Sequence, residues 1–241
     1  LRSGFSEVSV TDYSNVLRTK GELPNLDRLP CVVGIDYAEL SDWAAVNLHF
    51  RIRDERYDIN HAWICAESQT LSRVKAPWKD WVKSGLITYV DGPSIQPSML
   101  AEYIRDAGRR YAVKAIAADH FRWTVLAEEM ARLGFDARDK QRVKLVRPSD
   151  IMKADTVIQT LFNESRLHWG DNPCLRWAVN NTKRVPSSRK TGSDAGNFYY
   201  AKIEAKSRKT DPFMAFVASI CIEDRLGSGA TVAVPPPVFV L

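Results

Sequence analysis

Three aspartates stand at the ends of apolar segments that are far apart in the sequence. Asp36 ends the run CVVGID, Asp119 ends VKAIAAD, and Asp211 begins DPFMAFVASICIED. The first two runs are typical of buried strands and the third of a helix. Clustered carboxylates repel one another unless cations neutralise them, and their oxygens are good ligands for Mg²⁺ and Mn²⁺. The pattern predicts that Asp36, Asp119 and Asp211 are catalytic and hold two such ions for phosphodiester hydrolysis.

Each of these aspartates also has a purely local interpretation. Asp36 and Asp119 would then be turn residues after strands, and Asp211, which precedes Pro212, would be a helix cap. Asp42 follows the short turn after Asp36 and is a further candidate metal ligand, although an aspartate before a strand often bonds only to nearby backbone. His120, next to Asp119, could reach the site, but a single histidine at a strand end is more often a packing or hydrogen-bonding residue.

A basic strip between residues 183 and 209 is the second chemical feature. It holds eight Lys and Arg against two Asp and Glu, a local charge of +6 in a chain whose formal net charge is +5. Cations beside a metal site suit a polyanionic substrate. The predicted DNA contacts are Arg184, Arg189, Lys190, Lys202, Lys206 and Lys209. Lys209, near Asp211, is also expected to act on the scissile phosphate, whereas the alternative for the whole strip is a solvated loop.

Periodicity along the chain predicts the elements that position these residues. Strands are expected at 31–36, 43–52, 57–67, 86–90, 113–119, 144–148 and 198–206. Helices are expected at 76–84, 97–111, 121–135, 149–165, 172–184 and from residue 211. Residues 1–30 are predicted to be a lead-in segment, 31–226 the compact domain and 227–241 an irregular tail, because the two ends are polar or rich in Gly and Pro.

The order of these elements predicts an α/β protein with a ribonuclease H-like mixed sheet. Three successive strands form an antiparallel meander, and the later strands alternate with helices, which places helices on both faces. A right-handed crossover makes the strand ending at Asp36 parallel to the strand ending at Asp119. Both carboxylates should then emerge at the same edge of the sheet.

Several other classes of protein are disfavoured. The four cysteines and four histidines show no zinc-ligand spacing. There is no apolar run of membrane-spanning length and no signal sequence, so we expect a cytoplasmic protein with no membrane partner. The phosphate-binding motif of P-loop ATPases is also missing, so ATP-driven translocation is not expected of this chain.

The segments VVGIDYAELSDWAAV, AIAADHFRW, NPCLRWAVNN and KIEAKSRKTDPFMAFVASI occur in this order and spacing. Together they resemble the nuclease domain of tailed-bacteriophage terminase large subunits over residues 31–226. The resemblance implies a ribonuclease H-like fold and cleavage of concatemeric viral DNA by acids matching Asp36, Asp119 and Asp211, with Asp42 matching a further acidic position. Pro212 departs from the family, in which a small residue is commoner after the last aspartate.

The resemblance also implies partners and a place of action. These are double-stranded DNA, a packaging ATPase domain, the small terminase subunit and the portal, in the host cytoplasm. The leading prediction is an Mg²⁺- or Mn²⁺-dependent endonuclease with little sequence specificity. A junction resolvase or transposase-like nuclease of the same fold is one alternative. A non-catalytic module for DNA binding or motor docking is another.

Overall fold

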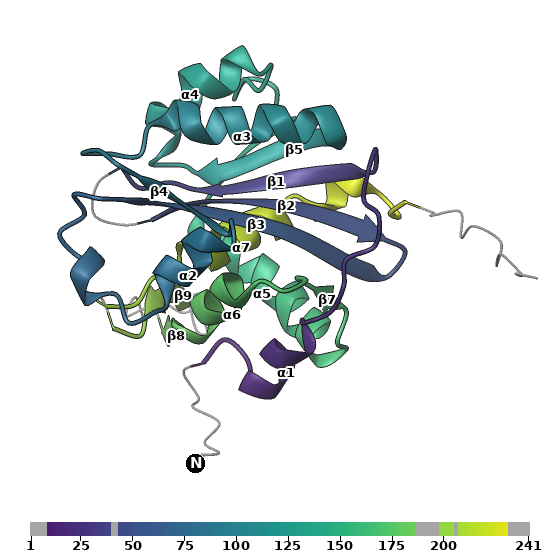
Figure 1. Cartoon of the computed structure of the whole chain (residues 1–241). Helices are drawn as coiled ribbons and strands as arrows, with labels where there is room; N and C mark the ends of the chain where they lie inside the picture. Colours follow the sequence, from purple (N-terminus) through teal and green to yellow (C-terminus); the bar gives the residue numbers. More distant parts are fainter. Residues whose placement is uncertain (1–8, 40–42, 187–197, 205–206, 231–241) are drawn as a thin grey trace, which may run out of the picture.

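The computed structural model describes residues 9–39, 43–186, 198–204 and 207–230. Its centre is a seven-stranded sheet in the order β4-β3-β2-β1-β5-β6, with β7 also beside β3 (Figure 1). The strands of this sheet are β1 (Pro30–Asp36), β2 (Ala44–Ile52), β3 (Glu55–Cys65), β4 (Ile87–Val90), β5 (Ala112–Asp119), β6 (Val143–Val146) and β7 (Leu167–His168).

The sheet combines an antiparallel meander with parallel strands, as the sequence predicted. β1 pairs antiparallel with β2, and β2 pairs antiparallel with β3. β5 lies parallel to β1 on its other side, and β6 lies parallel to β5. β1 therefore runs through the middle of the sheet, which explains why almost all of its residues are apolar and buried.

Helices cover both faces of the sheet (Figure 1). The helices are α1 (Tyr13–Arg18), α2 (Trp78–Lys83), α3 (Pro97–Arg110), α4 (Trp123–Arg132), α5 (Pro148–Asn163), α6 (Pro173–Asn180) and α7 (Asp211–Ile220), with short 3-10 turns η1 (Leu71–Arg73) and η2 (Glu223–Leu226). α3 and α4 lie on one face, and α2, α5, α6 and α7 lie on the other. Within the described residues, no helix is both long and apolar enough to cross a bilayer.

Alternation along each strand divides the core between these two faces. In β1, Val33 and Ile35 pack in the cluster under α3 and α4, whereas Val32 packs in the cluster that includes Ala218 of α7. In β5, Ile116 and Ala118 belong to the α3 and α4 side. Since side chains alternate with a period of two, the last residues of both strands project toward the face that α7 covers.

Gly34 allows α7 to lie directly against β1. A Cβ built on Gly34 would come within 1.9 Å of the Ala215 carbonyl oxygen and 2.4 Å of the Ser219 nitrogen. No side chain fits in that space, so the backbones of α7 and β1 are in contact there. The backbone of α7 is also held at its start, where Asn60 Nδ2 on β3 donates to the Pro212 carbonyl at 3.0 Å.

The chain after α6 differs from the prediction. The helix expected over 172–184 ends at Asn180, and β8 (Thr182–Pro186) follows immediately. β8 forms an antiparallel two-stranded sheet with β9 (Phe198–Lys202). Strand pairing of β8 with β9, which begins at Phe198, overrides its helical pattern, and this partner lies outside a short window around residues 182–186.

The start of α5 differs by one residue from the prediction, whereas α7 begins at Asp211 as predicted. The N-cap of α5 is Arg147 rather than Ser149, because Pro148 occupies the first helical position and Asp150 Oδ2 accepts from the Arg147 backbone at 2.9 Å. The N-cap of α7 is Thr210, so Asp211 is the first helical residue and Pro212 the second. Asp211 is therefore not the capping residue of the local interpretation.

The N-terminal segment carries core residues where it is described. Val10 and Val16 pack in the cluster that also contains Ile158, Leu175 and Phe213, so residues 9–30 are more than a solvated lead-in. Of the predicted tail, residues 227–230 are described, and the Ala230 backbone donates to the Arg51 carbonyl at 3.0 Å.

Candidate metal centre

Asp36 and Asp119 end neighbouring parallel strands. Their preceding residues, Ile35 and Ala118, are partners in the β1–β5 register. Both aspartates are half-buried and line one small cavity of about 40 Å³. The cavity is also bounded by Met214, Val217 and Ala218 of α7 and by Val146 and Ile151. The two carboxylates thus come together at the carboxyl edge of the sheet, as predicted from the two strands.

Asp119 also organises the turn that follows it. Its Oδ1 accepts hydrogen bonds from the backbone nitrogens of Phe121, at 2.8 Å, and Arg122, at 3.3 Å. The local interpretation of Asp119 as a turn residue is therefore correct for this oxygen. Among the described residues these bonds involve Oδ1 alone, so Oδ2 can take a further ligand. A turn residue and a metal ligand are compatible roles for one carboxylate.

Asp211 lies at the start of α7 and is only 5% exposed. Ala215, one turn further along, packs in a cluster with Trp43, Ala45 and Cys174, and Ala45 is the partner of Asp36 in the β1–β2 register. Burial, and secondly the negative charge of Asp211, raise the pKa of the Cys174 thiol. Asp211 is thus near this cluster, at the end of the sheet where Asp36 lies.

The predicted set of acids is only partly assembled. Asp36 and Asp119 share a cavity that Asp211 does not line. Within the described part of the chain, no three His, Cys, Asp or Glu side chains form a group that could hold an ion. Asp42 lies outside the described residues. Asp36 and Asp119 offer carboxylate oxygens to one cavity. Oxygen is the ligand type that Mg²⁺ and Mn²⁺ prefer, so the two residues suit either ion.

Among the predicted DNA contacts that the structure describes, Arg184 is engaged with the protein itself. Arg184 on β8 pairs with Asp155 of α5 at 2.8 Å, and its guanidinium lies 5.5 Å from the centre of the Phe198 ring. Lys202 is half-buried on β9. Arg189, Lys190 and Lys206 lie outside the described residues.

Lys209 does not occupy the solvent-facing position that was predicted. It is 1% exposed, and its Nζ donates to Thr70 Oγ1 at 2.9 Å. Its sequence neighbours are basic and polar, which suggested a surface strip, but the segment before α7 packs against the loop containing Thr70. A side chain buried in this way is not part of an exposed DNA-binding surface.

Two arginines at the carboxyl edge were not singled out from the sequence. Arg122 follows β5 and Arg147 follows β6, and both are exposed. The signal was their position directly after the buried strand runs, where a residue must emerge at the same edge as Asp119. Net charge along the chain pointed instead to the more strongly basic 183–209 segment.

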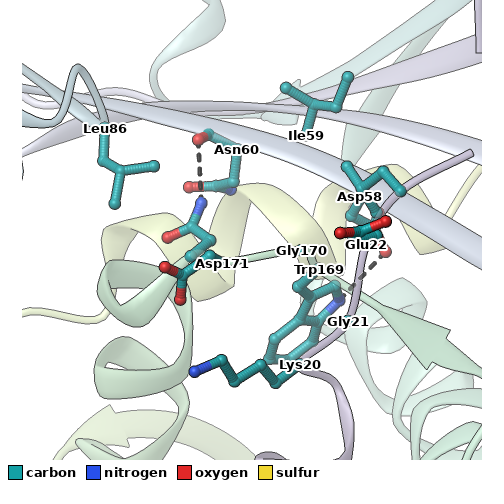
Figure 2. Close-up of a pocket in the computed structure, with 12 residues that line it drawn as sticks. Lys20, Gly21, Glu22, Asp58, Ile59, Asn60, Leu86, Trp169, Gly170 and Asp171 are labelled. Carbon is teal, nitrogen blue, oxygen red and sulfur yellow. Dashed lines mark hydrogen bonds between the residues drawn. The ribbon is translucent and has the colours of Figure 1, made fainter. Parts of the chain in front are cut away.

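A larger cavity of about 630 Å³ lies elsewhere, between β3, the segment at residues 20–23 and the residues before α6. Figure 2 shows its polar lining: Trp169 donates to Asp58 at 3.1 Å, and Asn172 donates to the Asn60 carbonyl at 3.1 Å. Asp58 also accepts from Asn47 at 2.8 Å. Its buried polar groups are bonded to their neighbours, which favours a structural role over a catalytic one.

Behind this cavity, His49 is part of a buried charge network. Its Nδ1 lies 2.7 Å from Asp58 and its Nε2 lies 3.1 Å from Glu223, and Arg56 also bonds Glu223 at 2.6 Å. Burial alone would lower the pKa of His49, but the two carboxylates outweigh it and raise the pKa to about 9. Burial opposes ionisation of Glu223, yet bonds from His49 and Arg56 lower its pKa to about 2.

Comparison with known proteins gives a family and a fold. The family model described as "Terminase large subunit, endonuclease domain" matches residues 7–220. No curated protein sequence matched the chain. The large terminase of bacteriophage HK97 superimposes with a TM-score of 0.72 and 20% identity, over 88% of this chain and 43% of that one. This chain thus spans less than half of the HK97 protein.

Two structures of the large terminase nuclease from thermophilic phage G20c are also similar. One has a TM-score of 0.55 and 10% identity, over 88% of this chain and 97% of that one. The other, with bound magnesium, has a TM-score of 0.54 and 11% identity, over 89% of this chain and 97% of that one. At these identities the likeness shows the fold, and it confirms the predicted ribonuclease H-like architecture.

Proposed function

Since this chain belongs to the terminase large subunit endonuclease domain family, we propose that it is a metal-dependent endonuclease that cuts double-stranded viral DNA during genome packaging. The observation that carries this proposal is the shared cavity of Asp36 and Asp119 at the carboxyl edge of two adjacent parallel strands. The magnesium-bound G20c nuclease, which has the same fold, supports a divalent ion.

Asp36 and Asp119 would hold the ions, and Asp211 at the start of α7 would complete the set together with Asp42. We propose two ions, Mg²⁺ or Mn²⁺. When bound, such ions stabilise the charge that develops on a phosphodiester during hydrolysis. The residues of this chain fix the carboxylates: the Asp119 turn holds one oxygen, and the Gly34 contact fixes α7 against β1. The substrate is proposed to be concatemeric DNA, cut with little sequence specificity in the host cytoplasm.

A full-length large terminase subunit would have further functions, and family membership is the basis for proposing them. A packaging ATPase domain, the small terminase subunit and the portal are the expected partners of a full-length large subunit. The HK97 protein is more than twice as long as the part matched by this chain, which leaves room for a further domain of that kind.

A non-catalytic DNA-binding or motor-docking module is the second candidate. It is favoured by the fact that the acids of the described residues do not form a three-member metal group. A plasmid-cleavage assay with Mg²⁺, with Mn²⁺ and with EDTA separates the two candidates. The endonuclease proposal expects nicked and linear products only with metal, and intact plasmid under all three conditions would reject it.

The same assay extended to branched DNA tests the junction-resolvase alternative. A terminase-type nuclease should cut a linear duplex and a four-way junction of the same sequence at similar rates. Cleavage confined to the junction would instead support the resolvase. Calorimetric titration of the protein with Mn²⁺ checks metal binding independently of cleavage.

A further inference from the structure

The turn after Asp119 displays three exposed side chains next to the proposed metal centre. His120, Phe121 and Arg122 are all exposed, and Phe121 has 82% of its surface accessible, although it is large and apolar. One exposed apolar side chain is ordinary on a protein surface; Phe121 is of interest because it stands between His120 and Arg122 beside the proposed metal centre. The turn is not loose, because Asp119 Oδ1 holds the backbone nitrogens of Phe121 and Arg122. The position of Phe121 is therefore tied to the carboxylate itself.

Arg122 has a charge that the described protein does not neutralise. Its guanidinium forms no ion pair with any described residue, whereas Arg184 on the predicted strip is paired with Asp155. Arg122 is also placed close to the Asp119 strand end, because its backbone nitrogen donates to Asp119 Oδ1 at 3.3 Å.

Arg147 places a second such charge on the adjoining strand end. It follows β6, whose Val146 is the register partner of Asp119, and the His120 backbone donates to the Val146 carbonyl at 3.2 Å. Arg147 is exposed, and like Arg122 it makes no ion pair within the described part of the chain. Two unneutralised arginines therefore stand on consecutive turns at the edge where Asp36 and Asp119 meet.

We propose that Arg122 and Arg147 bind backbone phosphates of the DNA on either side of the Asp119 turn, and that Phe121 packs against a sugar between them. This inference rests on the proposed nuclease function and specifies its DNA path. Charge complementarity selects the occupant: an edge with two exposed guanidiniums that form no ion pair with a described residue suits a polyanion. An apolar ring between them suits a deoxyribose, which a duplex exposes along its backbone while its bases stay stacked on one another. The DNA then crosses the carboxyl edge of β5 and β6 rather than following the β8–β9 sheet.

DNA binding measured without metal tests whether Arg122 and Arg147 contact phosphates. Fluorescence anisotropy of a labelled linear duplex is measured in EDTA at several salt concentrations for wild type, Arg122→Ala, Arg147→Ala and the double variant. Each substitution should reduce the slope of log affinity against log salt by about 0.9, and the double variant by about twice that. Arg109→Ala is the matched control, because Arg109 is exposed near the end of α3, at the opposite end of β5 from Asp119. It should leave the slope unchanged.

The role of Phe121 is tested by a change in DNA affinity that leaves the salt slope unchanged. Phe121→Ala should weaken binding by roughly fivefold at every salt concentration without changing the salt slope, because it removes apolar contact area and no charge. Phe121→Trp should restore affinity. Tyr13→Ala is the control for loss of an exposed aromatic, since Tyr13 on α1 is 60% exposed. Circular dichroism melting of each variant confirms that the fold is retained.

Plasmid cleavage by the wild type separates failure of this inference from failure of the nuclease proposal. If the wild type cleaves with metal but the Arg122, Arg147 and Phe121 variants bind DNA like their controls, the DNA path is wrong and the nuclease stands. If binding depends on these residues but no metal supports cleavage, the DNA path stands and the nuclease proposal fails.

Discussion

Asp119 combines two roles that sequence reasoning treats as alternatives. Its Oδ1 holds the following turn through the Phe121 and Arg122 backbone nitrogens, while the carboxylate shares a cavity with Asp36. An asparagine keeps the carbonyl oxygen that accepts these bonds but removes the negative charge. The two roles are therefore separable by a single isosteric substitution.

We expect Asp119→Asn to abolish metal-dependent plasmid cleavage while its melting temperature stays within a few degrees of wild type. The turn survives because the amide oxygen still accepts, whereas a neutral ligand weakens binding of a hard cation. Asp139→Asn is a matched control, since Asp139 Oδ1 accepts from Gln141 at 3.0 Å and Arg142 at 3.2 Å in the same type of turn. Cleavage by Asp119→Asn at the rate of this control would remove Asp119 from the metal site.

Asp211 differs because it stands in the first turn of a buried helix. Asp211→Asn is expected to abolish cleavage and to destabilise the protein by no more than about 2 kcal/mol, the upper effect of one charge at a partly buried helix start. Asp150→Asn, which removes an acid from the first turn of α5, is the control and should keep cleavage activity. Urea unfolding and plasmid cleavage measure the two effects. Normal cleavage by Asp211→Asn would leave Asp211 as a helix residue only.

At the scale of elements, the contact between α7 and β1 decides where Asp211 lies relative to Asp36. Asp36 is on β1 and Asp211 is on α7. The backbones of β1 and α7 meet at Gly34. Asn60 fixes the start of the same helix through Pro212. The geometry of the acids is thus a property of helix-on-sheet packing.

Gly34→Ala should destabilise the fold by about 1–3 kcal/mol or more, because the new methyl group must displace α7. Cleavage activity of the fraction that remains folded should also fall, since Asp211 moves with the helix. Gly108→Ala on α3 is the control: a Cβ there meets nothing within 4 Å, and an alanine in a helix should stabilise by roughly 0.5–1 kcal/mol. Chemical denaturation of both variants checks this. Equal stabilities would mean that α7 can shift without cost.

At the scale of the whole molecule, the buried His49 and the half-buried His61 link stability to pH in opposite directions. His49, bonded to Asp58 and Glu223, has its pKa raised to about 9 from an ordinary value of 6.5. His61 on β3 has its pKa lowered to about 4 by burial. The folded protein therefore retains a proton on His49 and loses one from His61 relative to the unfolded chain.

These shifts predict a stability maximum near pH 6.5. The His49 contribution is complete below pH 6.5 and is lost as pH rises through about 9, because the unfolded chain loses its proton first. Below pH 6.5 the unfolded chain gains a proton at His61 that the folded protein accepts only near pH 4, so stability falls on that side too. Melting temperatures from pH 4.5 to 8.5 test this.

Two variants test which histidine causes the loss of stability on each side of pH 6.5. His61→Gln should flatten the decline below pH 6.5, and His49→Gln should flatten the decline above it, each leaving the other side in place. His49→Gln should also lower stability at every pH, because it leaves Asp58 and Glu223 buried with one partner fewer. A wild-type melting temperature that is constant across the range would contradict both assignments.

The sequence by itself determined the sheet edge and the two acids on it. Runs such as CVVGID and VKAIAAD are apolar throughout, so they must be covered on both faces, and a right-handed crossover then makes them parallel neighbours. That arrangement requires Asp36 and Asp119 to end at one edge, and strand alternation places them on one face. These conclusions need only local pattern and general rules of chain connection.

Only the tertiary structure decided which charged side chains face solvent and which are bonded to other residues of the protein. Arg184 and Lys209 have basic sequence neighbours, but Asp155 and Thr70, their partners, lie at distant sequence positions. The strand β8 exists because β9 pairs with it, and the position of Asp211 depends on the fit of α7 against Gly34. Each of these results from contacts between residues far apart in the chain, whose free energies are comparable to local preferences and do not appear in any short window of sequence.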